Sequence, residues 1–164
     1  MLIRPERSED HVAIRAVTVA AFASSPYGHS NEADIVDALR ANGELTLSLV
    51  AEADAQIVGH IAFSPVRITV AVGDWYGLAP LSVIPEWQRS GIGQALVREG
   101  LRGLEVLGAA GCVVLGDPEY YGRFGFESDP AIRYGPEVSP YMQRLLFTGH
   151  APAGEVRYHP AFDG

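Results

Sequence analysis

The residues best suited to chemistry lie in the stretch PEWQRSGIGQAL, residues 85–96. Two glycines, Gly91 and Gly93, are separated there by one residue, and an apolar pattern with helical spacing begins just after them. Backbone N–H groups in the first turn of a helix carry partial positive charge, and glycines let an anion approach them because no Cβ intervenes. The stretch therefore predicts a loop that binds a phosphate group.

Dinucleotide-binding folds, P-loop NTPases and acyl-coenzyme A enzymes all use such a loop, and the spacing argues against the first two. A dinucleotide fingerprint needs Gly-x-Gly-x-x-Gly straight after a strand, but its third position here is Leu96, and seven residues separate Val83 from Gly91. A P-loop needs Gly-Lys-Ser or Gly-Lys-Thr, which does not follow the glycines. The glycines alone would also fit a plain turn before a helix.

The elements that must position this loop can be predicted from periodicity. The helix after it is expected to end near Leu107 with Gly108 as its cap, between a strand in LAPLSVI and a buried strand CVVL. Pro80 in the first strand predicts an edge, a bulge or a place where the ladder opens. The segment DPEYYGRFGF is expected to begin with a short helix, and strands are expected around residues 141–147 and 155–158.

Upstream, the pattern predicts a strand at residues 2–4 and a helix that Ser8 caps and that ends near Ala23. A second helix over 31–42, capped by Gly43, precedes a strand over 45–53 and a segment 56–72 that reads as two strands interrupted at Pro65. This order predicts a mixed α/β or α+β sheet with helices on its faces.

Composition predicts a soluble globular chain with a single domain over residues 1–164. The net charge of −8 argues against nucleic acid as a partner and mildly favours cationic ligands such as amines. The single cysteine, Cys112, lies in an apolar strand and is expected to be inert, and no Cys/His cluster has zinc-ligand spacing. With no run typical of a signal peptide or a membrane span, the protein is expected to be cytoplasmic, with no membrane partner.

The flanking sequence LAPLSVIPEWQRSGIGQALVREGL resembles the pyrophosphate-binding motif of the GNAT superfamily of acetyl-coenzyme A-dependent N-acetyltransferases, Arg/Gln-x-x-Gly-x-Gly/Ala. Gln88, Gly91 and Gly93 occupy its defining positions, and Ser90 stands where many members have a basic residue. YYGRFGF is similar to the family's Tyr-x-x-x-Gly-Phe segment. GDPEYYGRFGF together with the later RYHPAF resembles a bacterial subgroup of predicted acetyltransferases, and the likeness extends in order over nearly the whole chain.

This resemblance implies the GNAT acyl-CoA N-acyltransferase fold, a mixed, mostly antiparallel sheet with helices on both faces that splays between its fourth and fifth strands. The pantetheine arm of acetyl-CoA would enter there and bind backbone groups of Leu81, Ser82 and Val83. The pyrophosphate would bind the loop after them, and acetyl-CoA would serve as a cosubstrate without a metal. The implied loop residues are Gln88, Arg89, Ser90, Gly91, Ile92 and Gly93.

The resemblance also places Tyr121 near the coenzyme sulfur as the catalytic general acid, although the adjacent Tyr120 leaves open which ring faces the sulfur. Many members have an asparagine before this tyrosine that contacts pantetheine, where this chain has Asp117 in GDPEYY. The loop that holds His29 is expected near the acceptor. The general base stays open among ordered water and three residues that interrupt apolar patterns, namely Glu32, Glu52 and His60.

The leading hypothesis is an N-acetyltransferase in which a primary amine attacks acetyl-CoA directly in a ternary complex, without a covalent enzyme intermediate. The alternative is a non-catalytic acyl-CoA binding or sensing module that has kept the loop and lost the chemistry. The acidic composition allows polyamines, aminoglycosides, amino acids and protein amines as acceptors. The oligomeric state is open as well, a homodimer included.

Overall fold

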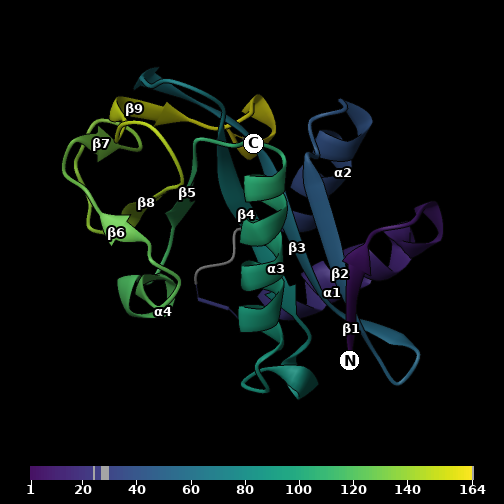
Figure 1. The fold of residues 1–164 in the computed structure, drawn as a ribbon. Helices are drawn as coiled ribbons and strands as arrows, with labels where there is room; N and C mark the ends of the chain where they lie inside the picture. The colour runs from purple at the N-terminus through teal and green to yellow at the C-terminus, as the bar shows by residue number, and fades with distance from the viewer. Residues whose placement is uncertain (24, 27–29, 164) are drawn as a thin grey trace.

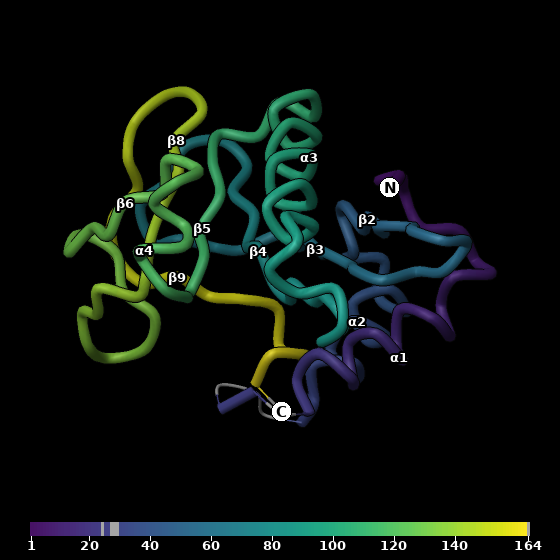
Figure 2. Tube along the Cα trace, turned by 90° about the horizontal axis from the view of Figure 1, so that it is seen from below, coloured from purple at the N-terminus to yellow at the C-terminus, as the bar shows by residue number. Residues whose placement is uncertain are grey.

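The computed structural model describes residues 1–23, 25–26 and 30–163. A twisted sheet runs through the molecule and carries helices on both faces (Figure 1). Figure 2 shows helix α3 on one side of the strands and helices α1 and α2 on the other. The helices are α1 (His11–Phe22), α2 (Glu32–Ala41), α3 (Ile92–Val106) and α4 (Pro118–Gly122), with 3-10 turns η1 (Ser8–Asp10), η2 (Pro85–Trp87) and η3 (Pro160–Asp163).

The main path of the sheet has the order β1-β2-β3-β4-β5-β8-β6, and β9 pairs with β3 and β7. Along this path β4 and β5 are parallel and the other neighbours antiparallel. The strands are β1 (Leu2–Pro5), β2 (Leu47–Ala53), β3 (Gln56–Val70), β4 (Trp75–Val83), β5 (Gly111–Leu115), β6 (Glu127–Ser128), β7 (Ile132–Arg133), β8 (Met142–Leu146) and β9 (Ala153–Arg157).

The larger part of the core lies between α3 and the sheet. Leu96, Leu101 and Leu104 of α3 are buried together with Ile61 and Phe63 of β3. Their spacing of three to five residues puts the leucines on one face of the helix, as its amphipathic pattern requires. On the opposite face of the sheet a smaller cluster joins α1 and α2 to β2 through Ile14, Val36 and Val50.

Most elements that the sequence predicts are present, and two details differ. Ser8 does not cap α1 but lies in the preceding turn η1, where the Asp10 carboxylate accepts the Arg7 backbone N–H at 2.7 Å. Residues 56–70 form one continuous strand that Pro65 does not interrupt. The Phe63 carbonyl, on the same edge as Pro65, binds Thr46 just before β2 begins, so proline's missing N–H lies where no strand pairs with it.

Strands β4 and β5 part in the middle of the sheet. They pair only from Trp75 to Gly77, opposite residues 111–113, although β4 continues to Val83. The register between β3 and β4 shifts between Ile61 and Phe63, so Ala79 and Pro80 of β4 lie opposite the single residue Ala62 of β3. A bulge bends its strand and increases the local twist. The prediction that the ladder bulges or opens at Pro80 is therefore confirmed, and the gap between β4 and β5 positions the site.

Candidate active site

Two cavities adjoin the part of β4 that has left β5. The first, the loop cleft, has a volume of about 240 Å³ and lies between the end of β4, the glycine loop and Tyr120 of α4. The second, the aromatic cavity, has a volume of about 630 Å³ and lies between α1, α2, the bulge of β4, the end of β5 and η3. Leu81 lines both, so both cavities adjoin this residue of β4.

The glycine loop presents open backbone to the loop cleft. Gly91 precedes α3 as its N-terminal cap with φ of +88°, in the left-handed region that glycine adopts without strain. A Cβ added there would meet nothing within 4 Å among the described residues. The first N–H groups of α3 have no acceptor within the helix, and the aligned peptide dipoles make this end positive. The loop is therefore a suitable cradle for an anionic group.

Three side chains of the loop make contacts that fix its backbone. Gln88 Nε2 donates to the Val83 carbonyl at 2.9 Å, and Ser90 Oγ donates to the Trp87 carbonyl. The Ile92 side chain is buried against Gly59 of β3. These contacts fix the conformation of the loop. Gln88, Ser90 and Ile92 therefore help to position the backbone N–H groups that would bind an anion.

Arg89 is the cationic residue of the predicted loop set. It is exposed, lines the loop cleft and has φ of +62°. A left-handed backbone is uncommon for a residue with a side chain and costs on the order of 1 kcal/mol. A second cation, Arg123, lies over the Tyr120 ring with 4.9 Å between its Cζ and the ring centroid. The chain thus brings positive charge to the cleft against a net charge of −8.

The backbone of β4 beyond the bulge presents alternate residues to the gap. Ile84 N–H donates to the Val58 carbonyl of β3, which directs the backbone groups of Ser82 to β3 as well. Leu81 and Val83 lie between these positions, so their backbone groups point away from β3. The Ser82 side chain is 1% exposed, and its Oγ has no hydrogen-bond partner among the described residues.

The short helix α4 places two adjacent tyrosines on different sides of the site. Asp117 caps the helix by accepting the Glu119 N–H at 2.9 Å, so this carboxylate holds α4 in place. Tyr120 lines the loop cleft, and its hydroxyl would lie 2.9 Å from a Cβ at Gly93. Tyr121 lines the aromatic cavity. Gly93 therefore has a packing role, since it makes room for Tyr120.

The Tyr121 ring packs against other aromatic rings on the side of the cavity that adjoins the core. It packs edge-on against Tyr120 and Phe126, with centroids 5.0 and 5.9 Å apart, and a Cβ at Gly116 would come within 2.5 Å of it. Burial raises the pKa of Tyr121, so its hydroxyl keeps its proton at neutral pH. Burial also raises the pKa of the fully buried Cys112 thiol, as expected for an inert core cysteine.

The three described candidates for a general base occupy different places. Glu32, the first residue of α2, lines the aromatic cavity. Glu52 pairs with Arg4 at 3.3 Å on the sheet edge formed by β1 and β2. His60 is fully buried in β3 and lines neither cavity. The remaining residue named for this region, His29, lies outside the described residues.

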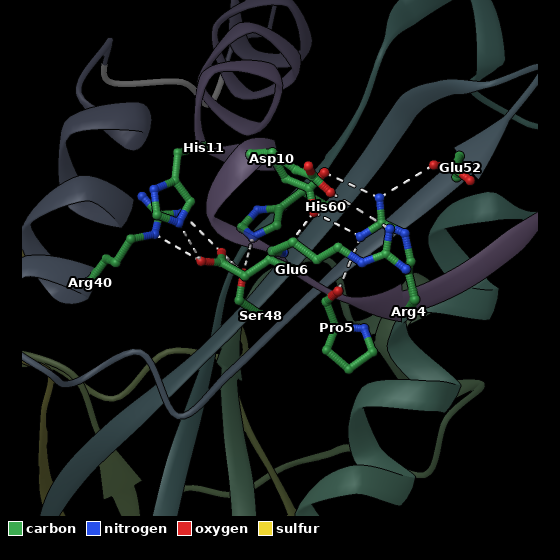
Figure 3. A network of polar contacts seen from close by, with 11 residues as sticks. Arg4, Pro5, Glu6, Asp10, His11, Arg40, Ser48, Glu52 and His60 are labelled. Carbon is green, nitrogen blue, oxygen red and sulfur yellow. Dashed lines mark hydrogen bonds and ion pairs between the residues drawn. The ribbon is translucent and has the colours of Figure 1, made fainter.

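His60 belongs to a buried polar network that Figure 3 shows from close by. Its Nε2 lies 2.8 Å from Ser48 Oγ, which donates its proton to Glu6, and Glu6 accepts two hydrogen bonds from Arg40 at 2.9 Å. Burial opposes ionisation of Glu6, but hydrogen bonds from Arg40 and Ser48 outweigh it and lower the pKa of this carboxyl.

This network assigns the tautomer of His60. Because Ser48 has one proton and gives it to the Glu6 carboxylate, it must accept a hydrogen bond from His60, so Nε2 carries the ring proton. Nδ1 is then a bare acceptor, buried without a partner among the described residues. Burial lowers the pKa of His60 to about 4, and the Glu6 carboxylate offsets part of the effect. His60 is therefore neutral and braces β2 against β3.

Some residues of the site could not be found from sequence patterns. Arg123 and Trp87 at the loop cleft carry no motif of their own. Tyr134 and Phe162 line the aromatic cavity. Phe162 lies in the RYHPAF segment, which resembles a bacterial subgroup, but that resemblance assigned no role to this residue. Tyr134 and Phe162 lie far from the glycine loop along the chain, which explains why spacing did not reveal them, whereas Trp87 and Arg123 stand inside quoted segments that assigned them no role.

A mixed sheet that opens between β4 and β5, with a glycine loop at the start of α3, defines an acyl-coenzyme A N-acyltransferase. Residues 44–128 match the acetyltransferase (GNAT) domain, and the chain belongs to this family. It is 39% identical over 170 residues to the uncharacterized N-acetyltransferase YhbS of Escherichia coli strain K12, covering 99% of each chain. The protein is therefore an acetyl-CoA-dependent acyltransferase.

Two solved structures support this assignment. A GNAT family acetyltransferase from Brucella melitensis, in complex with acetyl-CoA, is 52% identical with a TM-score of 0.87 and covers 99% of this chain and 97% of its own. YhbS from Escherichia coli in complex with CoA is 37% identical with a TM-score of 0.89, covering 99% of this chain and 92% of its own. The predicted fold and family are confirmed.

Two classes of feature are absent from the part of the chain that the structure describes. No helix there is long and apolar enough to cross a lipid bilayer. No group of three or more His, Cys, Asp or Glu side chains there is arranged to hold a metal ion.

Proposed function

We propose that this protein acetylates a primary amine by direct attack of the amine on acetyl-CoA, with both substrates bound at once. The observation that carries the proposal is that Leu81 lines both the loop cleft and the aromatic cavity. A coenzyme in one and an acceptor in the other would meet beside β4 without an enzyme nucleophile between them. The single cysteine of the chain, Cys112, is fully buried and lines neither cavity.

Acetyl-CoA supplies an activated acyl group when bound, and the loop cleft fits its pyrophosphate and arm. Open N–H groups after Gly91 would hold the pyrophosphate, with Arg89 adding a charge-assisted contact. Backbone groups of Leu81 and Val83 would bind the pantetheine arm as a neighbouring strand would. We assign this contact to these two residues and not to Ser82, whose backbone groups point to β3.

Tyr121 has the role of a hydrogen-bond donor to the departing thiolate. Its raised pKa keeps the hydroxyl protonated, whereas a free thiol titrates near ~8.5. Complete transfer of the proton is therefore uphill, and the hydroxyl acts mainly by stabilising charge on sulfur while solvent delivers the proton. In balance, a C–N bond forms as the C–S bond breaks. An amine that arrives as an ammonium group loses one proton before the attack and a second one after it, of which one ends on sulfur and the other in solvent.

Glu32 is the candidate base that the geometry favours, because it lines the cavity that we assign to the acceptor. Its carboxylate would hold the incoming ammonium group and take up the proton that the nitrogen loses, directly or through water. Glu52 and His60 face other parts of the molecule and receive structural roles. A homodimer and a cytoplasmic location stay predictions, and light scattering in solution measures the first.

Steady-state kinetics tests the proposal. Thiol release from acetyl-CoA is measured over a matrix of acetyl-CoA and amine concentrations, and direct attack predicts double-reciprocal lines that intersect. Parallel lines would show a covalent acetyl-enzyme and contradict the mechanism. Tight CoA binding by calorimetry with no thiol release for any primary amine would favour the non-catalytic binding module instead.

A further inference from the structure

The aromatic cavity is lined mostly by apolar and aromatic side chains. Four aromatic side chains line it, and its remaining apolar lining comes from α2, the bulge of β4 and Leu115 of β5. Apart from tyrosine hydroxyls, the polar side chains in its described lining are Asn31 and Glu32, which adjoin each other at the start of α2. The four rings belong to Phe22, Tyr121, Tyr134 and Phe162.

Two of these rings pack against Tyr158, a partly buried residue just after β9. Tyr158 packs edge-on against Tyr134 and Phe162, with centroids 5.4 and 5.2 Å apart. The Tyr158 ring lies on the Gly77 backbone, where a Cβ would come within 2.6 Å of it. Gly77 is the last residue of β4 that pairs with β5. The C-terminal RYHPAF segment thus anchors the wall at the point where the sheet opens.

This wall limits the acceptors that the cavity can hold. Each polar group that a ligand brings into apolar surroundings without a partner costs roughly 1–3 kcal/mol. A polyamine or an aminoglycoside carries several such groups, and among the described lining residues only Asn31, Glu32 and the tyrosine hydroxyls could meet them. An aromatic ring, by contrast, gains offset or edge-to-face contacts with the rings of the wall.

The other end of the acceptor needs a single positive charge. Glu32 supplies a carboxylate at the rim, and the net charge of −8 attracts cations toward the protein. The volume of about 630 Å³ lies within the range of sites for small molecules. Charge, shape and lining therefore describe a compact ligand with one ammonium group and one ring.

We infer that the acceptor is a small arylalkylamine, whose ring occupies the space between Tyr134 and Phe162 and whose amino group lies between Glu32 and Tyr121. The inference rests on the proposed acetyl transfer and specifies its substrate class. The reaction balances as before: the amine nitrogen bonds to the acetyl carbon, the C–S bond breaks, and the ammonium form loses two protons, of which one ends on sulfur and the other in solvent. It requires no oxidant or metal.

A set of matched amines tests the class. 2-Phenylethylamine and ethanolamine share a two-carbon amine arm and differ in a phenyl or hydroxyl end, and we expect kcat/KM to be about 100-fold higher for the former. 2-Cyclohexylethylamine, with a saturated ring, should fall about 5-fold below 2-phenylethylamine because it lacks aromatic contacts. Spermidine and kanamycin represent the polar acceptors and should react no faster than ethanolamine.

Binding to the CoA-saturated enzyme provides a readout that does not depend on turnover. By calorimetry, Tyr134→Ala and Phe162→Ala should each raise the Kd of 2-phenylethylamine about 10-fold and leave the Kd of CoA unchanged. Tyr141→Ala is the matched control, since Tyr141 is 58% exposed outside the cavity whereas Tyr134 is 40% exposed. Glu32→Gln should weaken binding of 2-phenylethylamine and not of the neutral 2-phenylethanol.

The outcomes separate the inference from the function on which it rests. Faster acetylation of ethanolamine, spermidine or kanamycin overturns the arylalkylamine class and leaves acetyl transfer standing. Equal rates for the cyclohexyl and phenyl amines overturn the aromatic assignment. CoA binding without acetylation of any amine overturns the proposed function itself. Because Phe162 packs on Tyr158, its variant is first checked by melting temperature, and the partly exposed Tyr134 gives a second variant.

Discussion

At the scale of single residues, the site depends on two tyrosines that follow each other in the chain. Consecutive residues of a helix point about 100° apart, so the Tyr120 and Tyr121 rings leave α4 in different directions. Tyr120 lines the loop cleft beside Gly93, and Tyr121 lines the aromatic cavity, where its hydroxyl stays protonated. The pair offers a matched experiment, because each loses one hydroxyl on conversion to phenylalanine.

Tyr121→Phe should lower kcat by about 10- to 100-fold and change the Kd of CoA by less than 2-fold, since a hydrogen bond to a developing charge contributes roughly 1.5–3 kcal/mol. Tyr120→Phe should leave kcat nearly unchanged, and any effect should be on the Kd of CoA. Steady-state rates with calorimetric CoA binding measure both variants. Equal kcat for Tyr121→Phe and the wild type would remove the assigned role.

At the scale of elements, helix α3 connects the coenzyme site to the core. Its N-terminus adjoins the loop cleft, while its leucines pack on β3. Glycines in the left-handed conformation flank both ends, Gly91 with φ of +88° and Gly108 with φ of +84°, and neither has an atom within 4 Å of an added Cβ among the described residues. The two glycines have the same backbone geometry, and only Gly91 faces the cleft.

Gly91→Ala should weaken CoA binding by at least about 10-fold, because a Cβ at a position with positive φ strains the loop and shields its N–H groups. Gly108→Ala is the control: it should cost a similar 1 kcal/mol or so of stability at the other end of α3 and leave CoA binding unchanged. Thermal unfolding and CoA titration measure the two effects. Equal losses of CoA affinity would mean that strain alone explains the change.

At the scale of the whole molecule, the buried network of Figure 3 joins β1, α2, β2 and β3. Its centre is neutral His60, which links through Ser48 to the ionised Glu6 and its partner Arg40. Removing one member leaves a buried polar group without its partner, which costs roughly 1–3 kcal/mol. The network makes the stability of the fold depend on pH.

The free energy of unfolding should fall by about 3 kcal/mol as the pH drops from 6.5 to 4. His60 has its pKa lowered to about 4 in the folded protein, against 6.5 as the reference value, so the unfolded chain binds more protons in this window. Stability from this group is thus complete above pH 6.5 and lost as the pH falls toward 4. Glu6, with its pKa also lowered from 4.5, adds to the loss only below that value.

Urea unfolding at several pH values measures this dependence. His60→Gln removes the titrating ring, so its stability should be lower at pH 7 and nearly flat between pH 6.5 and 4.5. A wild-type curve as flat as that of the variant would contradict the assignment of a neutral, buried His60. Acetyltransferase rates are not needed for this test, because His60 lines neither cavity.

The sequence by itself determined the local chemistry. Gly91 and Gly93 before an amphipathic helix predicted the anion loop, because helix ends and glycine conformations depend on residues close in the chain. Alternating and helical periods predicted most elements, and Pro80 indicated the break in the ladder. The short strands β6 and β7 and the continuity of β3 through Pro65 could not be predicted from local patterns, since both depend on neighbouring strands.

Only the tertiary structure decided which distant residues share a cavity. The register of β3 on β4 separates Ser82 from Leu81 and Val83, the packing of α4 turns Tyr120 and Tyr121 to different sides, and β9 carries Tyr158 over Gly77. Contacts that join residues tens of positions apart follow from strand order and helix packing, which no local pattern records. The sequence therefore predicts where acetyl-CoA binds. Only the folded structure shows which residues line the cavity that we assign to the amine.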